Sequence, residues 1–122
     1  MPLNSAIIVE FKRAERKGYD ENPVQQIYRY VKKLQGQKIH DTRNRTIQIH
    51  PQAMFHCYIV ADLTPELRTI LEESGLEPTP DASGYMIYNK NFRTYVEVMS
   101  YDKLLKDSSD RNRELFKALS LA

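Results

Sequence analysis

The sequence predicts an α/β (α+β) domain in which a mixed β-sheet is flanked by helices. Runs of β-branched and aromatic residues indicate strands, and segments with apolar residues three and four positions apart indicate amphipathic helices. These segments follow one another in the order β-α-β-α-β-β-α. At 122 residues the chain is long enough for one hydrophobic core, so we expect a single domain over residues 1–122.

The first strand and the first helix have the clearest signals. The strand is expected from about Ala6 to Phe11, where apolar residues lead into a charged end, and a charged loop follows over residues 13–21. Asn22-Pro23 is an N-cap followed by a first helical residue, and the helix should end near Gly36. Its apolar stripe consists of Val24, Ile27, Tyr28, Val31 and Leu34.

The middle of the chain is expected to supply a central strand. Residues 36–52 are polar and irregular, with a short strand predicted at Thr46–Ile49. Met54–Ala61 is almost continuously hydrophobic, which is typical of a central strand covered on both faces. A second helix should begin at Thr64-Pro65-Glu66 and end at Gly75.

The last third of the chain predicts a β-hairpin and a final helix. Residues 78–81 form a break, after which Gly84–Tyr88 and Phe92–Met99 are two strands joined by a short Asn-rich turn. Ser100 is positioned to cap a helix from Tyr101 to about Leu119. The middle of that helix is polar throughout, and a kink or break is expected there.

Composition excludes several classes of protein. The chain is 41% hydrophobic and 28% charged, without low-complexity tracts, which indicates a folded domain. No run approaches 18 apolar residues and the N-terminus lacks a signal-peptide pattern, so we expect no membrane partner. The single cysteine, Cys57, cannot form an internal disulfide, and we expect a cytoplasmic location.

Charge is distributed unevenly along the chain. Residues 1–50 carry ten Lys/Arg and five Asp/Glu, whereas residues 51–122 carry eight and eleven. A basic first half suits a polyanionic partner such as nucleic acid, although a margin of this size is also common in proteins that bind none.

The end of the first strand carries the strongest candidate site. Glu10 and Lys12 are two residues apart in a strand, so their side chains share one face of the sheet. A carboxylate beside an ammonium is the arrangement of metal-dependent phosphodiester cleavage, and the alternative is an ion pair on an edge strand. In the first case Glu10 and the backbone carbonyl of Phe11 would bind Mg²⁺ or Mn²⁺. Lys12 would then orient the attacking water or stabilise negative charge.

A row on the first helix adds a second set of candidates. Gln26 and Tyr30 lie one helical turn apart, on a face away from the apolar stripe. They would contact nucleic acid or brace Lys12, and the alternative is an ordinary solvated helix face. The basic residues expected to contact a nucleic-acid backbone are Arg13, Arg29 and Lys33.

Other reactive side chains are assigned structural roles. The three histidines do not form ligand spacing with Cys57, so we expect no zinc site. Cys57 lies inside an apolar run and is expected to pack in the core. The four glycines are scattered rather than gathered in a phosphate-binding loop, so we expect no nucleotide cofactor.

Residues 8–13 followed by residues 22–31 resemble the PD-(D/E)XK nuclease superfamily, in particular RecB-like members with a Gln-x-x-x-Tyr helix. The resemblance implies a restriction-endonuclease-like core and divalent-metal-dependent hydrolysis of nucleic acid, DNA above all. Glu10 would be the acidic metal ligand and Lys12 the motif lysine. Gln26 and Tyr30 would be the helix pair.

The whole chain also looks like the C-terminal region of large bacterial proteins that carry an ATPase-like region of the histidine-kinase/chaperone type upstream. This resemblance implies an upstream domain of the same protein as a partner. The segments that carry it are Asp62-Leu63-Thr64, Thr79-Pro80-Asp81, Gly84-Tyr85, residues 100–105 and Arg111-Asn112-Arg113.

One departure from the superfamily pattern is important. Its site also uses an aspartate, usually after a proline, on the strand before Glu-x-Lys, and residues 1–9 contain no acidic residue. We therefore expect a C-terminal fragment whose nuclease-like core lacks its N-terminal elements and which is weakly active or inactive. Asp20, Glu21, Asp62 or a second chain are the other sources of an acid.

Two other functions remain open at this point. The domain could keep the nuclease-like fold as a non-catalytic module that binds nucleic acid or protein. A structural role is the third possibility, with exposed sheet edges driving a homodimer.

Overall fold

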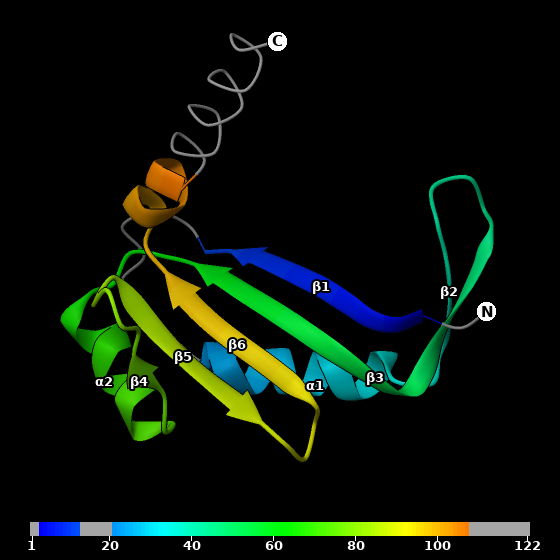
Figure 1. The fold of residues 1–122 in the computed structure, drawn as a ribbon, viewed down its shortest axis with the longest axis horizontal. Helices are drawn as coiled ribbons and strands as arrows, with labels where there is room; N and C mark the ends of the chain where they lie inside the picture. The colour runs from blue at the N-terminus through cyan, green and yellow to red at the C-terminus, as the bar shows by residue number, and fades with distance from the viewer. Residues whose placement is uncertain (1–2, 13–20, 108–122) are drawn as a thin grey trace, which may run out of the picture.

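The computed structural model describes residues 3–12 and 21–107, which form a six-stranded mixed sheet with helices (Figure 1). The strand order is β1-β3-β6-β5-β4, and β2 pairs separately with β3. The first three strands of this order are parallel, and the remaining pairs are antiparallel. The strands are β1 (Leu3–Phe11), β2 (Lys38–His40), β3 (Thr46–Val60), β4 (Glu77–Pro78), β5 (Gly84–Asn89) and β6 (Thr94–Met99).

Helix α1 (Pro23–Leu34) lies against one face of the sheet (Figure 1). Its start is fixed by Asn22, whose side chain accepts a hydrogen bond from the backbone N–H of Val24 at 2.8 Å. Helix α2 (Pro65–Glu73) begins in the same way, with Thr64 accepting from the N–H of Leu67 at 3.2 Å. The buried side chains of both helices join those of the sheet in one hydrophobic core.

The α/β prediction is confirmed, and so are the two capped helices and the β5–β6 hairpin. Two short strands, β2 and β4, were not predicted. The last helix is described for Tyr101–Asp107, and the rest of the predicted helix lies outside the described residues. No helix in the described part of the chain is long and apolar enough to cross a membrane.

Strand β3 runs without interruption through Pro51. Two separate segments were predicted here from the sequence, because a proline commonly interrupts a strand. Pro51 stands where β3 changes partners: β2 pairs up to Gln48, whereas β1 pairs with Ile49 and then, after a register shift, from Met54 onward. A proline lacks an N–H donor and is tolerated where the pairing is interrupted. The strand therefore continues through it.

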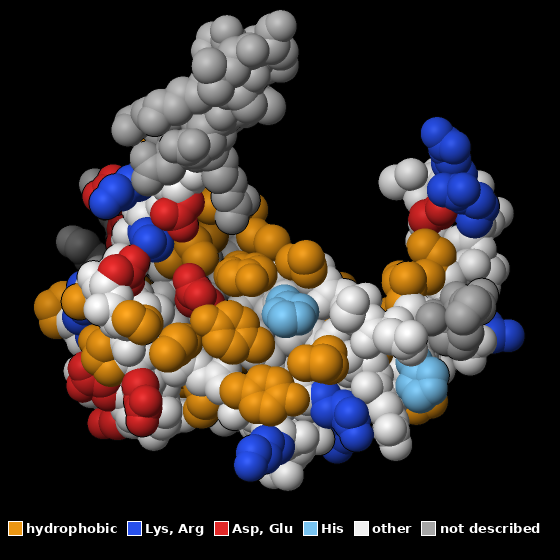
Figure 2. Space-filling model, in the orientation of Figure 1, with side chains coloured by type: hydrophobic (Ala, Val, Ile, Leu, Met, Phe, Trp, Pro, Cys, Tyr) orange, Lys and Arg blue, Asp and Glu red, His pale blue; other side chains and the backbone are white. Residues whose placement is uncertain are grey.

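The prediction that β3 is covered on both faces holds only in part. Phe55, Cys57 and Ile59 are fully buried on the side of α1. On the other side Val60 is buried at the C-terminal end of β3, but Met54 is 40% exposed. We call this second side the open face, and Figure 2 shows its hydrophobic side chains. The register places on it Ile7, Val9, Phe11, Met54, His56, Tyr58, Val60, Met86, Tyr88, Tyr95, Glu97 and Met99.

Candidate functional site

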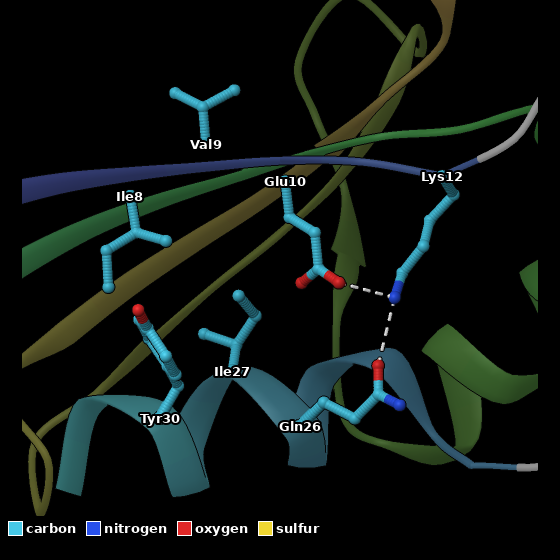
Figure 3. A pocket seen from close by; sticks show the side chains of 7 residues that line it. All are labelled: Ile8, Val9, Glu10, Lys12, Gln26, Ile27 and Tyr30. Atoms are coloured by element: carbon cyan, nitrogen blue, oxygen red, sulfur yellow. Dashed lines mark hydrogen bonds and ion pairs between the residues drawn. The ribbon is translucent and has the colours of Figure 1, made fainter. Parts of the chain in front are cut away.

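Glu10 and Lys12 point from the end of β1 toward α1 (Figure 3). Glu10 is in register with Ile59, whose side chain is buried beneath the helix, so alternation along the strand turns Glu10 the same way. The N–H of Lys12 donates to the carbonyl of Val60 at 2.8 Å, which extends the β1–β3 pairing by one residue. Strand pairing thus fixes the direction of both side chains.

The Lys12 ammonium is held by two acceptors. Its Nζ donates to Glu10 Oε1 at 2.6 Å and to Gln26 Oε1 at 2.9 Å (Figure 3). The Lys12 side chain is only 7% exposed, compared with 35% for Glu10. The pair therefore lies on an edge strand, but its cation is buried rather than solvated.

A second carboxylate reaches this cluster through Gln26. The Gln26 amide donates from Nε2 to Glu21 Oε2 at 3.0 Å, and Glu21 also forms an ion pair with Arg29. The polar network runs from Glu10 through Lys12, Gln26 and Glu21 to Arg29. The sequence suggested Glu21 only as a possible source of a missing acid, because the path of the preceding loop is not encoded in any local pattern.

These side chains line a pocket with a volume of about 400 Å³. Tyr30 borders it and is 54% exposed, and Lys33, one turn further along α1, is exposed. The lining consists of Ile8, Val9, Glu10, Lys12, Gln26, Ile27 and Tyr30 (Figure 3). The fold therefore brings to one pocket the four residues Glu10, Lys12, Gln26 and Tyr30 that were predicted as site residues from their spacing and from the family resemblance.

Phe11 was predicted to bind the metal through its backbone carbonyl, and its side chain does not line the pocket. The Phe11 side chain is on the open face, is 59% exposed, and lies near the ring of Tyr101, with centroids 6.5 Å apart. Arg13 lies outside the described residues. The Tyr101 hydroxyl also donates to the backbone carbonyl of Lys12, a contact between distant parts of the chain that no sequence pattern predicts.

The described residues do not fit the divalent cation that the resemblance implies. Glu10 is the acidic side chain lining the pocket, and one of its oxygens already accepts from Lys12. Across residues 3–12 and 21–107, no three His, Cys, Asp or Glu side chains gather as a metal site would require. No chemical step through a metal follows from this set of residues.

Cys57 packs in the core, as expected. It is fully buried, and burial raises the pKa of its thiol to about 12. Its sulfur is therefore protonated at neutral pH, which is unsuited to nucleophilic chemistry.

Comparison with protein-family models, curated proteins and solved structures finds no match for this chain. The assignment of a function therefore depends on the geometry of the Glu10–Lys12–Gln26 pocket.

Proposed function

We propose that the chain is a nuclease-like domain that binds nucleic acid, DNA above all, with its phosphodiester backbone at the Glu10–Lys12–Gln26 pocket. The observation that carries this proposal is the buried Lys12 ammonium, held between a carboxylate and an amide oxygen at the wall of a 400 Å³ pocket. An ammonium fixed in advance can stabilise an anionic phosphate without reorganising its surroundings.

The roles of the three side chains follow from their donors and acceptors. An ammonium has three N–H donors, of which Glu10 and Gln26 take two, and we assign the third to a phosphate oxygen. The second oxygen of Glu10 would accept a proton from an attacking water. Gln26 would position Lys12 rather than contact the substrate.

Catalysis in the manner of the PD-(D/E)XK superfamily would need Mg²⁺ or Mn²⁺ and a further acidic ligand. Glu10 is the carboxylate of the described pocket, so residues 1–122 should cleave DNA weakly or not at all. A cytoplasmic location and an upstream ATPase-type domain as partner belong to the same proposal.

Binding to DNA tests the proposal directly. In the presence of EDTA, the chain should bind a labelled duplex, and Lys12→Gln should weaken binding several-fold, as expected when one phosphate contact is lost. Lys90→Gln, which removes one exposed positive charge elsewhere, is the control. Thermal unfolding followed by circular dichroism shows whether each variant folds. Gln26→Ala is a second variant, which leaves the positive charge of Lys12 intact. Equal binding by the Lys12 and Lys90 variants would contradict the proposal.

A plasmid-nicking assay distinguishes an enzyme from a binding module. We expect little or no cutting with either Mg²⁺ or Mn²⁺. Robust Mg²⁺-dependent cutting that Lys12→Ala abolishes would overturn this prediction and show that the site is complete.

A non-catalytic binding module is the second candidate. It is favoured by the pairing of Glu10 with Lys12, which engages a carboxylate oxygen that a metal would need. Salt-dependent DNA binding without cutting in any divalent metal, unchanged in affinity when metal is added, would favour the module.

A further inference from the structure

Strand β2 and the start of β3 form an antiparallel hairpin, residues 38–48, that extends beyond the edge strand β1 (Figure 1). Lys38 pairs with Gln48 and His40 with Thr46, so these four exposed polar side chains share one face of the ribbon. The alternate pair, Ile39 and Ile47, is half-buried on the other face. The hairpin therefore offers a wholly polar face to a partner.

The tip of the hairpin is tightly organised by Asp41. Its Oδ1 accepts from the N–H of Arg43 at 2.9 Å and from the N–H of Arg45 at 2.8 Å. Its Oδ2 accepts from Arg45 Nε at 2.8 Å. These bonds, chiefly those to Arg45, hold the pKa of Asp41 below its usual value. Both carboxylate oxygens of Asp41 therefore accept hydrogen bonds within the turn, and the side chain of Arg43 is exposed at the surface of the turn.

The hairpin belongs to the basic part of the molecule. Residues 29–50 contain six Lys/Arg and one Asp, whereas residues 51–107 contain five Lys/Arg and nine Asp/Glu. Figure 2 shows Lys and Arg side chains concentrated at the projecting tip, with acidic side chains toward the opposite end. Such a field steers a polyanion to the hairpin end. The basic residues concerned are Arg29, Lys32, Lys33, Lys38, Arg43 and Arg45.

We propose that this hairpin is a DNA-binding arm whose polar face enters the major groove while Lys38 and Arg43 contact the flanking phosphates. The major groove of B-form DNA is about 12 Å wide and admits a two-stranded ribbon. The major groove of an RNA duplex is too narrow for side chains to read, so the geometry favours DNA. The arm rests on the proposed function, because it assumes that the partner of this chain is duplex DNA.

Fluorescence anisotropy with labelled duplexes tests the arm in EDTA, so that binding is measured apart from cleavage. Lys38→Gln/Arg43→Gln removes two charges whose side chains are exposed, and should weaken binding about tenfold or more at low salt. The slope of log affinity against log salt should become shallower by roughly 2. Lys90→Gln/Lys106→Gln removes the same charge outside the arm and should have little effect.

Two outcomes would overturn the arm. One is equal weakening of DNA binding by the two double variants, and the other is equal affinity of the wild type for DNA and RNA duplexes. Failure of the proposed function gives a different result: the Lys12→Gln variant would bind as tightly as the Lys90→Gln control while the arm variant still lost affinity.

Discussion

Lys12 is charged and almost completely buried, a combination that proteins tolerate only where the ammonium has good acceptors. Glu10 and Gln26 supply them from a strand and a helix that are adjacent in the chain. The contact with Glu10 could be anticipated, because strand alternation is a local property of the sequence. The contact with Gln26 was one of three alternatives for its helix face, since helical periodicity places Gln26 beside Tyr30 but does not say what that face meets. The contacts of Glu21 and Tyr101 could not be anticipated, since they depend on the path of a loop and on a strand order that brings distant segments together.

Asp81 is a second residue whose charge is tightly engaged, away from the pocket. It accepts from Lys103 Nζ at 2.6 Å, from Ser83 Oγ at 2.6 Å and from Thr79 Oγ1 at 2.7 Å. The Lys103 ammonium, followed by these hydroxyls, holds the pKa of Asp81 well below its usual range. The carboxylate thereby joins the turn before β5 to the helical residues after β6.

This depressed pKa predicts how stability depends on pH. Because the folded-state pKa lies below the unfolded value of about 3.9, the contribution of Asp81 is complete above that pH and is lost as the pH falls toward the folded-state value. Asp81→Asn should therefore lower the urea midpoint at pH 7, with a smaller difference from the wild type at pH 3. Glu77→Gln, at an exposed carboxylate, should show little effect. If the difference in urea midpoint between Asp81→Asn and the wild type stayed constant from pH 7 to pH 2, the stabilisation would not come from the ionised Asp81 carboxylate.

At the scale of the elements, the predictable parts were those with local start and stop signals. Asn22-Pro23 and Thr64-Pro65 marked both helices, and Asn89 accepts from the N–H of Asn91 at 2.9 Å in the predicted hairpin turn. The continuity of β3 was missed, because whether Pro51 breaks a strand depends on which partner faces it. The exposure of the open face was missed for a similar reason, since a hydrophobic run does not reveal what lies above it.

Gly84 shows how closely β5 and β6 approach each other. A Cβ atom at this position would lie 2.2 Å from the carbonyl oxygen of Val98, well inside van der Waals contact. Gly84→Ala should lower the free energy of unfolding by about 2 kcal/mol or more, because the backbone of a central strand must shift. Urea denaturation measures this effect.

Gly36→Asn provides the contrast. Gly36 has φ = 75°, which asparagine tolerates better than most residues, and an added Cβ would meet Pro51 at an ordinary 3.6 Å. We expect a loss well below that of Gly84→Ala. If the two variants lost equal free energy of unfolding, the close approach to Val98 would not explain the destabilisation by Gly84→Ala.

At the scale of the whole molecule, β1 is an edge strand of the sheet that the described residues form. It stands at the end of the strand order, and Ile7, Val9 and Phe11 are at least half exposed on the open face. Edge strands commonly carry lysine, proline or a bulge that blocks pairing with another chain. Between Ser5 and Val9 this strand carries no charge or proline. Association of two copies through this edge remains a prediction.

Ile7→Lys should reduce concentration-dependent self-association, measured by light scattering coupled to size-exclusion chromatography. Ile7 is 71% exposed, so the free energy of unfolding should change by no more than about 0.5 kcal/mol. Tyr88→Lys introduces the same charge on the open face but away from the edge. An equal reduction by Tyr88→Lys would assign the association to the face rather than to the edge.

The parallel pairing of β1 with β3 also determines when the pocket can form. Glu10 lies beside Ile59, about fifty positions later in the chain, and β3 is in turn supported by β6, which ends at Met99. Pairings between such distant segments form slowly, because a long loop must close before any contact is gained. During synthesis, β1 must therefore wait for most of the described chain to emerge. Its hydrophobic edge is open to chaperones and to neighbouring chains throughout that interval.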